Sequence, residues 1–165
     1  MLSLIHLISF LAFLSPVFAL LYRVENRPPV QVREEGGIKA WNPDGDGSVF
    51  DHVRGTLGTN DPWVSTTSSY DFAKNSATMP SDIYIYKIDN LEVDSVDTIK
   101  AFRDANLEHP HPGEKEFAVK GIVEWDDAIT GWDVYRFSKL VESVDKDDWE
   151  EANPQAKRKA RAFFA

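Results

Sequence analysis

The sequence has no cysteine among its 165 residues. This absence excludes disulfides and thiolate metal sites, so an exported chain of this size would depend on its hydrophobic core alone for stability. The sequence also has no Asn-x-Ser/Thr acceptor, and N-linked glycans are therefore not expected. It contains no internal repeat and no low-complexity run.

Positive charge is scarce as well. The chain carries 18 lysines and arginines against 27 aspartates and glutamates, which gives a formal net charge of -9. A surface this acidic is repelled by nucleic-acid phosphates and by anionic lipids. We therefore expect no nucleic-acid partner, and the charge favours a partner protein with a basic surface.

Charged side chains are missing from residues 1–19, which are largely apolar. Pro16 and the small residue Ala19 favour cleavage at the end of this run, so we interpret it as a signal peptide and expect a secreted protein. A membrane anchor is the alternative, because Leu20 and Leu21 extend the apolar run to a length that just spans a bilayer. After cleavage we expect no stable membrane insertion.

The rest of the composition is that of a folded protein, since 42% hydrophobic and 12% aromatic residues exclude a disordered chain. Residues 82–89 are apolar on both faces and predict a central strand. Residues 63–69 predict a strand that ends in hydroxyl side chains, and residues 95–105 predict an amphipathic helix. A mixture of strand and helix patterns indicates the α/β class.

Residues 109–119 are the most distinctive stretch. A Pro-x-Pro-Gly run forms a turn-rich lead-in to an apolar strand. On an extended backbone, Glu114 and Glu116 would point to one face about 7 Å apart, with Lys115 on the other face. The two glutamates would then face one cleft. Taken alone, a Glu-x-Glu pair is more often a solvated strand edge.

Three further features are ambiguous when each is taken alone. Arg23 stands in an apolar strand pattern, where it is either a structural ion-pair partner or an anion ligand. His52 is a lone histidine, which is more often structural than catalytic. The hydroxyl run at residues 65–69 fits helix capping as well as a site.

The acidic pair at positions 44 and 46 lacks the glycine and glutamate of a calcium loop, so we expect no metal site.

Together and in this order, these stretches resemble the mono-ADP-ribosyltransferase toxins, the enzymatic subunits of cholera toxin, heat-labile enterotoxin and pertussis toxin. Each motif is weak by itself, and the shared order makes the resemblance strong over residues 20–137. The matching segments are Leu21-Tyr22-Arg23 with Arg27-Pro28-Pro29, Gly37-Ile38-Lys39-Ala40-Trp41, His52-Val53-Arg54-Gly55-Thr56, Trp63-Val64-Ser65-Thr66-Thr67, Ile83-Tyr84-Ile85-Tyr86 and His111-Pro112-Gly113-Glu114-Lys115-Glu116.

The resemblance implies an α/β (α+β) ADP-ribosyltransferase fold, with two packed β-sheets, peripheral helices and an NAD cleft between the sheets. We expect the catalytic domain to span residues 20–140. Residues 141–165 would then form a charged helical tail, acidic first and basic last. A solvated terminal helix is the favoured interpretation of this tail, and a membrane-contacting or partner-binding tail is the alternative.

The resemblance also assigns roles around NAD. Arg23 would hold the phosphate and adenosine side, which suits a planar guanidinium with a permanent charge. His52 would contact the ribose or help to order the target. Ser65 would brace the pocket and orient Glu116 by hydrogen bonding, and Thr66 would support the strand. The residues implied to bind NAD are Tyr22, Arg23, His52, Ser65 and Thr66.

The catalytic residues implied are Glu116, Glu114 and Ser65. Cleavage of the nicotinamide–ribose bond passes through an oxocarbenium-like state, which an ionised carboxylate at Glu116 would stabilise. Glu114 would position and polarise the acceptor, and in the family a glutamate there accompanies an arginine acceptor. The expected activity is transfer of ADP-ribose from NAD to an arginine of a target protein, for example in a host cell. The alternatives are an NAD glycohydrolase and a catalytically silent secreted binding protein.

Two departures from the family limit what carries over. The missing cysteines exclude the disulfide that links the cholera-type subunit to its carrier, so no disulfide-linked carrier subunit is expected. The third position of the family's Ser-Thr-Ser motif is Thr67, which keeps the hydroxyl group.

Overall fold

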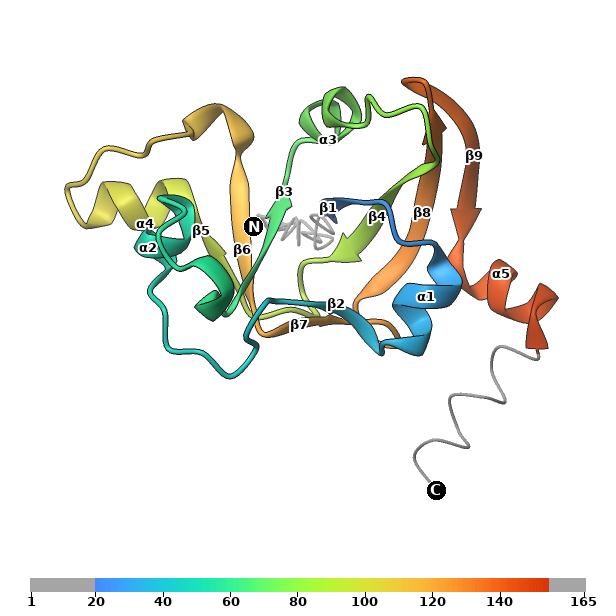
Figure 1. Ribbon diagram of the computed structural model, residues 1–165, viewed down its shortest axis with the longest axis horizontal. Coiled ribbons are helices and arrows are strands. Elements are labelled where there is room, and N and C mark those ends of the chain that lie inside the picture. The colour runs from blue at the N-terminus through green and yellow to red at the C-terminus, as the bar shows by residue number, and fades with distance from the viewer. Residues whose placement is uncertain (1–19, 155–165) are drawn as a thin grey trace, which may run out of the picture.

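A computed structural model describes residues 20–154. The predicted signal peptide, residues 1–19, and residues 155–165 of the predicted tail lie outside the described residues. The described chain forms a seven-stranded antiparallel sheet, a two-stranded sheet and short helices at the periphery (Figure 1). The predicted α/β fold with two sheets is therefore confirmed.

The elements are short, and their bounds are as follows. The strands are β1 Leu20–Glu25, β2 Gly37–Lys39, β3 Trp63–Thr67, β4 Ile83–Asp89, β5 Ser95–Asp97, β6 Glu116–Lys120, β7 Ile122–Glu124, β8 Ile129–Arg136 and β9 Lys139–Asp145. The α-helices are α1 Pro29–Glu34, α2 Val49–Val53, α3 Tyr70–Ser76, α4 Thr98–Asp104 and α5 Lys146–Ala152. The 3₁₀ turns are η1 Gly58–Asn60 and η2 Pro112–Glu114.

The large sheet is opened between two of its strands. Its strand order is β5-β6-β3-β1-β4-β8-β9, and the small sheet pairs β2 with β7. All six residues of β1 pair with β4. With β3, in contrast, β1 shares one paired position, Tyr22 opposite Thr67. The two strands diverge from this point (Figure 1), so side chains of both line an opening in the sheet.

Strand β4 separates two hydrophobic clusters. Ile83 and Ile85 pack into one cluster, beneath α3. Tyr86 and Ile88 belong to the larger cluster. All four side chains are buried, so β4 is apolar on both faces and lies inside the sheet, as its sequence predicts.

The predicted helix at residues 95–105 is wrong in its first three positions. Residues 95–97 form β5, in which Val96 pairs with Ala118 of β6. The helix α4 begins at Thr98, and the Asp97 carboxylate caps it by accepting a hydrogen bond from the Lys100 N–H. Pairing with β6 therefore overrides the helical periodicity at the start of this segment.

The predicted helical tail from residue 141 is also wrong at its start, because β9 continues to Asp145 and pairs with β8. None of the residues of α5 is fully buried, but one face of the helix packs against the fold. The ring of Trp149 lies 5.9 Å from the ring of Trp125 and 5.5 Å from that of Trp132. Trp125 also donates its indole N–H to Glu150, at 2.8 Å. One face of the described part of the tail is thus packed onto the rest of the fold.

Across residues 20–154, no helix combines the length and the apolar character that crossing a bilayer requires.

We expect Trp149→Ala to lower the free energy of unfolding by about 1–3 kcal/mol, because it removes the aromatic side chain that docks α5. Chemical denaturation of the variant and the unaltered chain measures the difference. The matched control is Trp41→Ala, since Trp41 is 78% exposed. Equal losses in the two variants would contradict a docked α5.

Candidate active site

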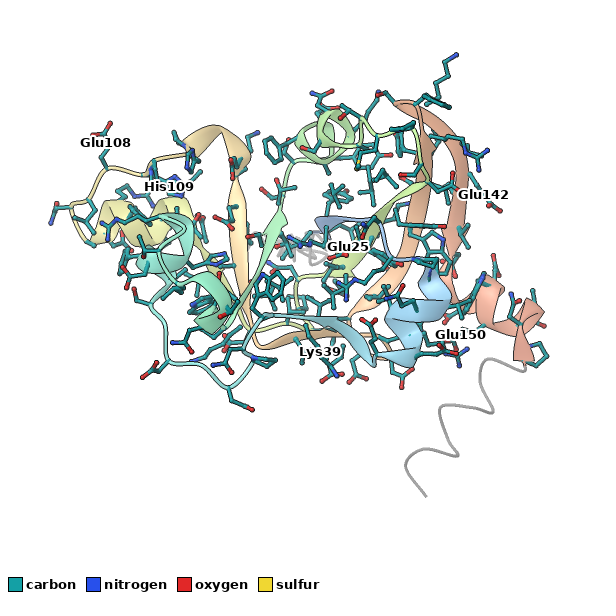
Figure 2. The ribbon with its side chains drawn as sticks, viewed as in Figure 1. Glu25, Lys39, Glu108, His109, Glu142 and Glu150 are labelled. Atoms are coloured by element: carbon teal, nitrogen blue, oxygen red, sulfur yellow. The ribbon has the colours of Figure 1, made fainter. Side chains whose placement is uncertain are left out.

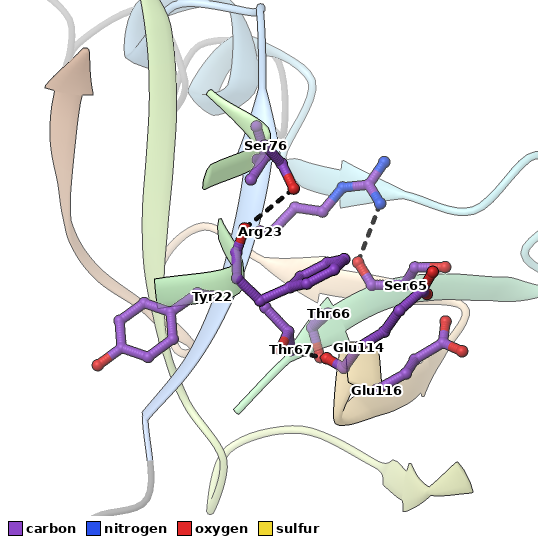
Figure 3. Close-up of a pocket in the computed structure, with 10 residues that line it drawn as sticks. Tyr22, Arg23, Ser65, Thr66, Thr67, Ser76, Glu114 and Glu116 are labelled. Carbon is purple, nitrogen blue, oxygen red and sulfur yellow. Dashed lines mark hydrogen bonds between the residues drawn. The ribbon is translucent and has the colours of Figure 1, made fainter. Parts of the chain in front are cut away.

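Two cavities adjoin at the opening between β1 and β3. The smaller, of about 140 Å³, and the larger, of about 740 Å³, share Arg23 and Ser65 in their walls. Glu114 and Glu116 also line the smaller cavity, and His52 lines the larger one. Figure 3 shows the smaller cavity with Arg23, Ser65 and both glutamates around it. The structure therefore brings together five of the residues that the sequence singles out.

Glu116 is the first residue of β6, and only 8% of its side chain is exposed. Its Oε1 lies 3.1 Å from Nε2 of His52, and the Ser65 hydroxyl lies 3.0 Å from the same nitrogen. Burial would raise the pKa of Glu116, but the hydrogen bonds from His52 and Ser65 outweigh burial and hold this pKa below its usual range. The result is an ionised carboxylate in a mostly buried position.

The backbone of Glu116 is fixed separately. The buried hydroxyl of Thr98 donates to the Glu116 carbonyl at 3.0 Å, and Nε2 of His109 lies 2.9 Å from the same hydroxyl. The backbone N–H of His111 donates to Nδ1 of His109 at 3.0 Å. When His109 is neutral, its proton is therefore on Nε2 and points to Thr98. This chain of hydrogen bonds ties the loop that carries His109 (Figure 2) to the start of β6.

His52, in α2, lies between two carboxylates. Its Nδ1 is 2.6 Å from Oδ2 of Asp61, and its Nε2 faces both Glu116 and the Ser65 hydroxyl, the latter at 3.0 Å. Burial alone would lower the pKa of His52, but hydrogen bonds to Glu116 and Asp61 outweigh burial and raise this pKa. The imidazole is therefore held toward its charged form.

Asp61 is a site residue that the sequence did not reveal. It lies in a loop-rich stretch where aspartates are common, so an aspartate there is not by itself a sign of a functional site. Its position two residues before β3, which carries Ser65, was the feature that could have drawn attention to it.

Glu114 lines the cavity, but the backbone around it does not have the predicted extended conformation. It ends η2, and Lys115 then adopts a left-handed backbone conformation with φ of 48°. The extended Glu-Lys-Glu geometry is therefore wrong, although both glutamates line the same cavity. The Thr67 hydroxyl donates to the Glu114 carbonyl at 2.6 Å, and the Lys115 carbonyl accepts the Ser68 N–H at 3.1 Å. These bonds to the end of β3 hold the turn in place.

Arg23 spans the opening from the β1 side. Its Nη1 donates to the Ser65 carbonyl at 2.9 Å, and its Nε donates to Glu25 at 3.1 Å. Burial would raise the pKa of Glu25, but the hydrogen bond from Arg27 and the positive charge of Arg23 outweigh burial and lower this pKa. With 34% of its side chain exposed, Arg23 combines a fixed orientation with access to both cavities.

Family membership follows from the sequence as a whole, which matches the heat-labile enterotoxin alpha chain over residues 3–160. The chain belongs to the heat-labile enterotoxin A family of ADP-ribosyltransferase toxins. The resemblance drawn from the ordered motifs is thereby confirmed. No curated protein sequence matches the chain.

Solved structures of toxins in this fold are similar along most of their length. A mutant of E. coli heat-labile enterotoxin is 22% identical, with a TM-score of 0.61 over 81% of this chain and 78% of that chain. Scabin toxin from Streptomyces scabies in complex with NADH is 25% identical, with a TM-score of 0.59 over 76% and 72%. A guanine-specific ADP-ribosyltransferase is 24% identical, with a TM-score of 0.58 over 76% and 74%.

Tyr22 and Thr66, the other two residues predicted to bind NAD, have structural contacts. The ring of Tyr22 points away from the cavity (Figure 3) and packs edge-on against Tyr70, with ring centroids 5.2 Å apart. The Thr66 hydroxyl donates to the Phe117 carbonyl of the neighbouring strand at 2.6 Å. Both residues line the smaller cavity, and their contact with NAD stays a prediction.

Metal ligands were not expected from the sequence. Within residues 20–154 the structure contains no group of three or more His, Asp or Glu side chains that could hold a metal ion.

The His52–Glu116 pair predicts a defined pH window of stability. The raised pKa of His52 gives stabilisation that is complete below its unfolded value of about 6.5 and is lost as pH rises through the folded value. The lowered pKa of Glu116 gives stabilisation that is complete above about 4.5 and is lost as pH falls through the folded value. Between these limits, Glu116→Gln should lower the melting temperature most.

Thermal denaturation across pH measures this difference. The control is Glu142→Gln, because Glu142 is exposed on the edge strand β9, on the side of the molecule away from the loop of His109 (Figure 2). A difference between Glu116→Gln and the unaltered chain that stays constant with pH would contradict the ion pair.

Proposed function

We propose that the protein transfers ADP-ribose from NAD to an arginine of a target protein and releases nicotinamide. The observation that carries this proposal is the ionised, mostly buried carboxylate of Glu116, held by His52 and Ser65 beside a cavity that Arg23 also lines. Membership of the enterotoxin family and the NADH complex of the related Scabin support NAD as the substrate.

The two adjoining cavities suit the two ends of NAD. The nicotinamide ribose occupies the smaller cavity, next to Glu116, and the pyrophosphate and adenosine extend into the larger one. Arg23 lies where the cavities meet and binds the phosphates through its guanidinium. Arg27 and Lys39 add positive charge to the wall of the larger cavity, while Glu25 keeps both arginines oriented.

Glu116 supplies electrostatic stabilisation to the bond-breaking step. As the ribose C–N bond breaks, its electron pair leaves with nicotinamide and positive charge develops on the ribose ring. A carboxylate that is already ionised and oriented stabilises this charge without reorganising. The Ser65 hydroxyl and the His52 ring orient the carboxylate but do not neutralise it by proton transfer, because the pKa of Glu116 is lowered.

Glu114 selects the acceptor. It lines the same cavity as Glu116 from the η2 turn, where it reaches an incoming group. A guanidinium pairs with a carboxylate, and local negative charge favours attack by such a weak base. The bond to the ribose carbon forms from a guanidinium nitrogen, which then releases its proton. The net charge of -9 favours an arginine on a basic protein surface over a nucleic-acid base, although one relative is guanine-specific.

Export is part of the same proposal. Residues 1–19 act as a signal peptide, and the mature catalytic domain begins at Leu20, the first residue of β1. The site residues Arg23, Ser65 and Glu116 are all present and assembled. This favours an active enzyme over a silent binding protein of the same fold. If water takes the place of the arginine acceptor, the same site hydrolyses NAD, and NAD glycohydrolysis is therefore the alternative activity.

Incubation with labelled NAD and a basic acceptor protein tests the assignment. We expect Glu116→Gln to lower both protein labelling and nicotinamide release about 100-fold or more, with NAD binding nearly unchanged, because the carboxylate acts mainly in the transition state. Glu142→Gln is the control for a glutamate outside the site. A Glu116→Gln variant that labels protein as fast as the unaltered chain would overturn the role of Glu116.

Glu114→Gln separates transfer from hydrolysis. We expect this variant to lose arginine labelling while it still releases nicotinamide from NAD, since Glu114 acts on the acceptor and not on the ribose. Cleavage of the protein label by reagents that act on arginine linkages identifies the acceptor. Nicotinamide release without labelled protein in the unaltered chain would instead assign an NAD glycohydrolase.

A further inference from the structure

We propose that Asp61 is a positioning residue of this site, which fixes the protonation and orientation of His52 and through it the carboxylate of Glu116. The contacts of Asp61 carry this inference, and only its consequence for catalysis rests on the proposed function.

Asp61 is itself held firmly. It follows η1, and its Oδ1 accepts the Trp63 N–H at 3.0 Å. Its backbone carbonyl accepts the Asn42 N–H at 2.9 Å. Its Oδ2 is thereby directed at Nδ1 of His52, at 2.6 Å. Only 16% of the Asp61 side chain is exposed, so solvent competes little for the carboxylate.

The donor and acceptor pattern fixes the state of the imidazole. An ionised carboxylate only accepts, so the short contact with Asp61 requires a proton on Nδ1 of His52. On the other side, Nε2 faces the Ser65 hydroxyl at 3.0 Å and the Glu116 carboxylate at 3.1 Å, and this carboxylate also only accepts. A neutral ring with its proton on Nδ1 would place a lone pair against Glu116. The imidazolium, with both nitrogens protonated, satisfies both carboxylates at once.

The charges around His52 support the same state. Asp61 and Glu116 face the ring directly, and their side chains are mostly buried. Asp51 is adjacent in sequence but forms hydrogen bonds with the Ser48 cap of α2 instead. The other charged residues in the wall of the larger cavity are Arg23, Glu25, Arg27 and Lys39.

The consequence for the reaction is a fixed charge balance. Asp61, His52 and Glu116 together carry two negative charges and one positive charge. These three side chains therefore keep one net negative charge beside the developing positive ribose, while repulsion between the two carboxylates is offset by the ring between them. Loss of the Asp61 charge would let His52 lose its proton at lower pH, and the hydrogen bond that orients Glu116 would weaken.

Asp61→Asn in the full chain tests the assignment by NMR titration of the histidine ring signals, with the His52 signal identified by its loss in His52→Gln. We expect the midpoint of the His52 titration to fall by about one pH unit or more, because a facing carboxylate within hydrogen-bond distance shifts a pKa by that order. Asp51→Asn is the matched control, since it makes the same chemical change next to His52 without touching the ring. An unchanged midpoint in Asp61→Asn would overturn the proposal.

The unaltered chain gives a second test that does not depend on the folding of a variant. Nitrogen chemical shifts of the His52 ring report which nitrogens carry protons. We expect both to be protonated at pH 6.5 and the proton on Nδ1 to persist when the ring becomes neutral. A neutral ring with its proton on Nε2 alone would contradict the role of Asp61.

Catalysis provides the third readout. We expect Asp61→Asn to lower kcat for nicotinamide release about tenfold or more, with KM for NAD nearly unchanged, and to shift the alkaline limb of the pH profile to lower pH. A shifted His52 titration in a chain without any NAD activity would sustain the role of Asp61 and reject the proposed function. Activity with an unaltered pH profile in Asp61→Asn would reject the role of Asp61 and leave the proposed function intact.

Discussion

The site depends on keeping a carboxylate ionised where little water reaches it. Desolvation of a carboxylate favours its neutral form, and a protonated Glu116 would lose the negative charge that the proposed reaction requires. His52 and Ser65 reverse this tendency, and neither belongs to the strand that carries Glu116. Their arrangement in turn requires β3 and α2 to lie against β6, so the topology of the large sheet determines the electrostatics of the site.

The opening between β1 and β3 follows from uneven pairing. A strand inside a sheet normally satisfies both edges by hydrogen bonding, yet β1 does so fully only toward β4. The guanidinium of Arg23 takes up part of the missing pairing by donating to the Ser65 carbonyl. One side chain therefore compensates for the interrupted ladder and lies in the walls of both cavities, which couples the integrity of the sheet to the shape of the site.

Much of the fold and part of the site could be predicted from the sequence. The apolar run at β4 and the capping serine before α3 are local signals, and the structure agrees with them. Asp61 and Thr98 act through partners far away in sequence, so no local pattern marks them. The left-handed Lys115 was missed for a different reason. A Glu-x-Glu pair looks extended in sequence, and only the bonds from β3 to η2 show that it turns.

The three hydroxyl residues of β3 make three different contacts. Because side chains alternate along a strand, the contact of each residue depends on the face to which it points. Ser65 and Thr67 are two apart and lie on the same face, with Ser65 meeting His52 and Thr67 donating to the Glu114 carbonyl. Thr66 instead donates to the Phe117 carbonyl of β6. Thr67 also accepts the Ser69 N–H, so its task needs a hydroxyl and not specifically a serine. The threonine at this third position therefore keeps the interaction that holds Glu114 beside Glu116.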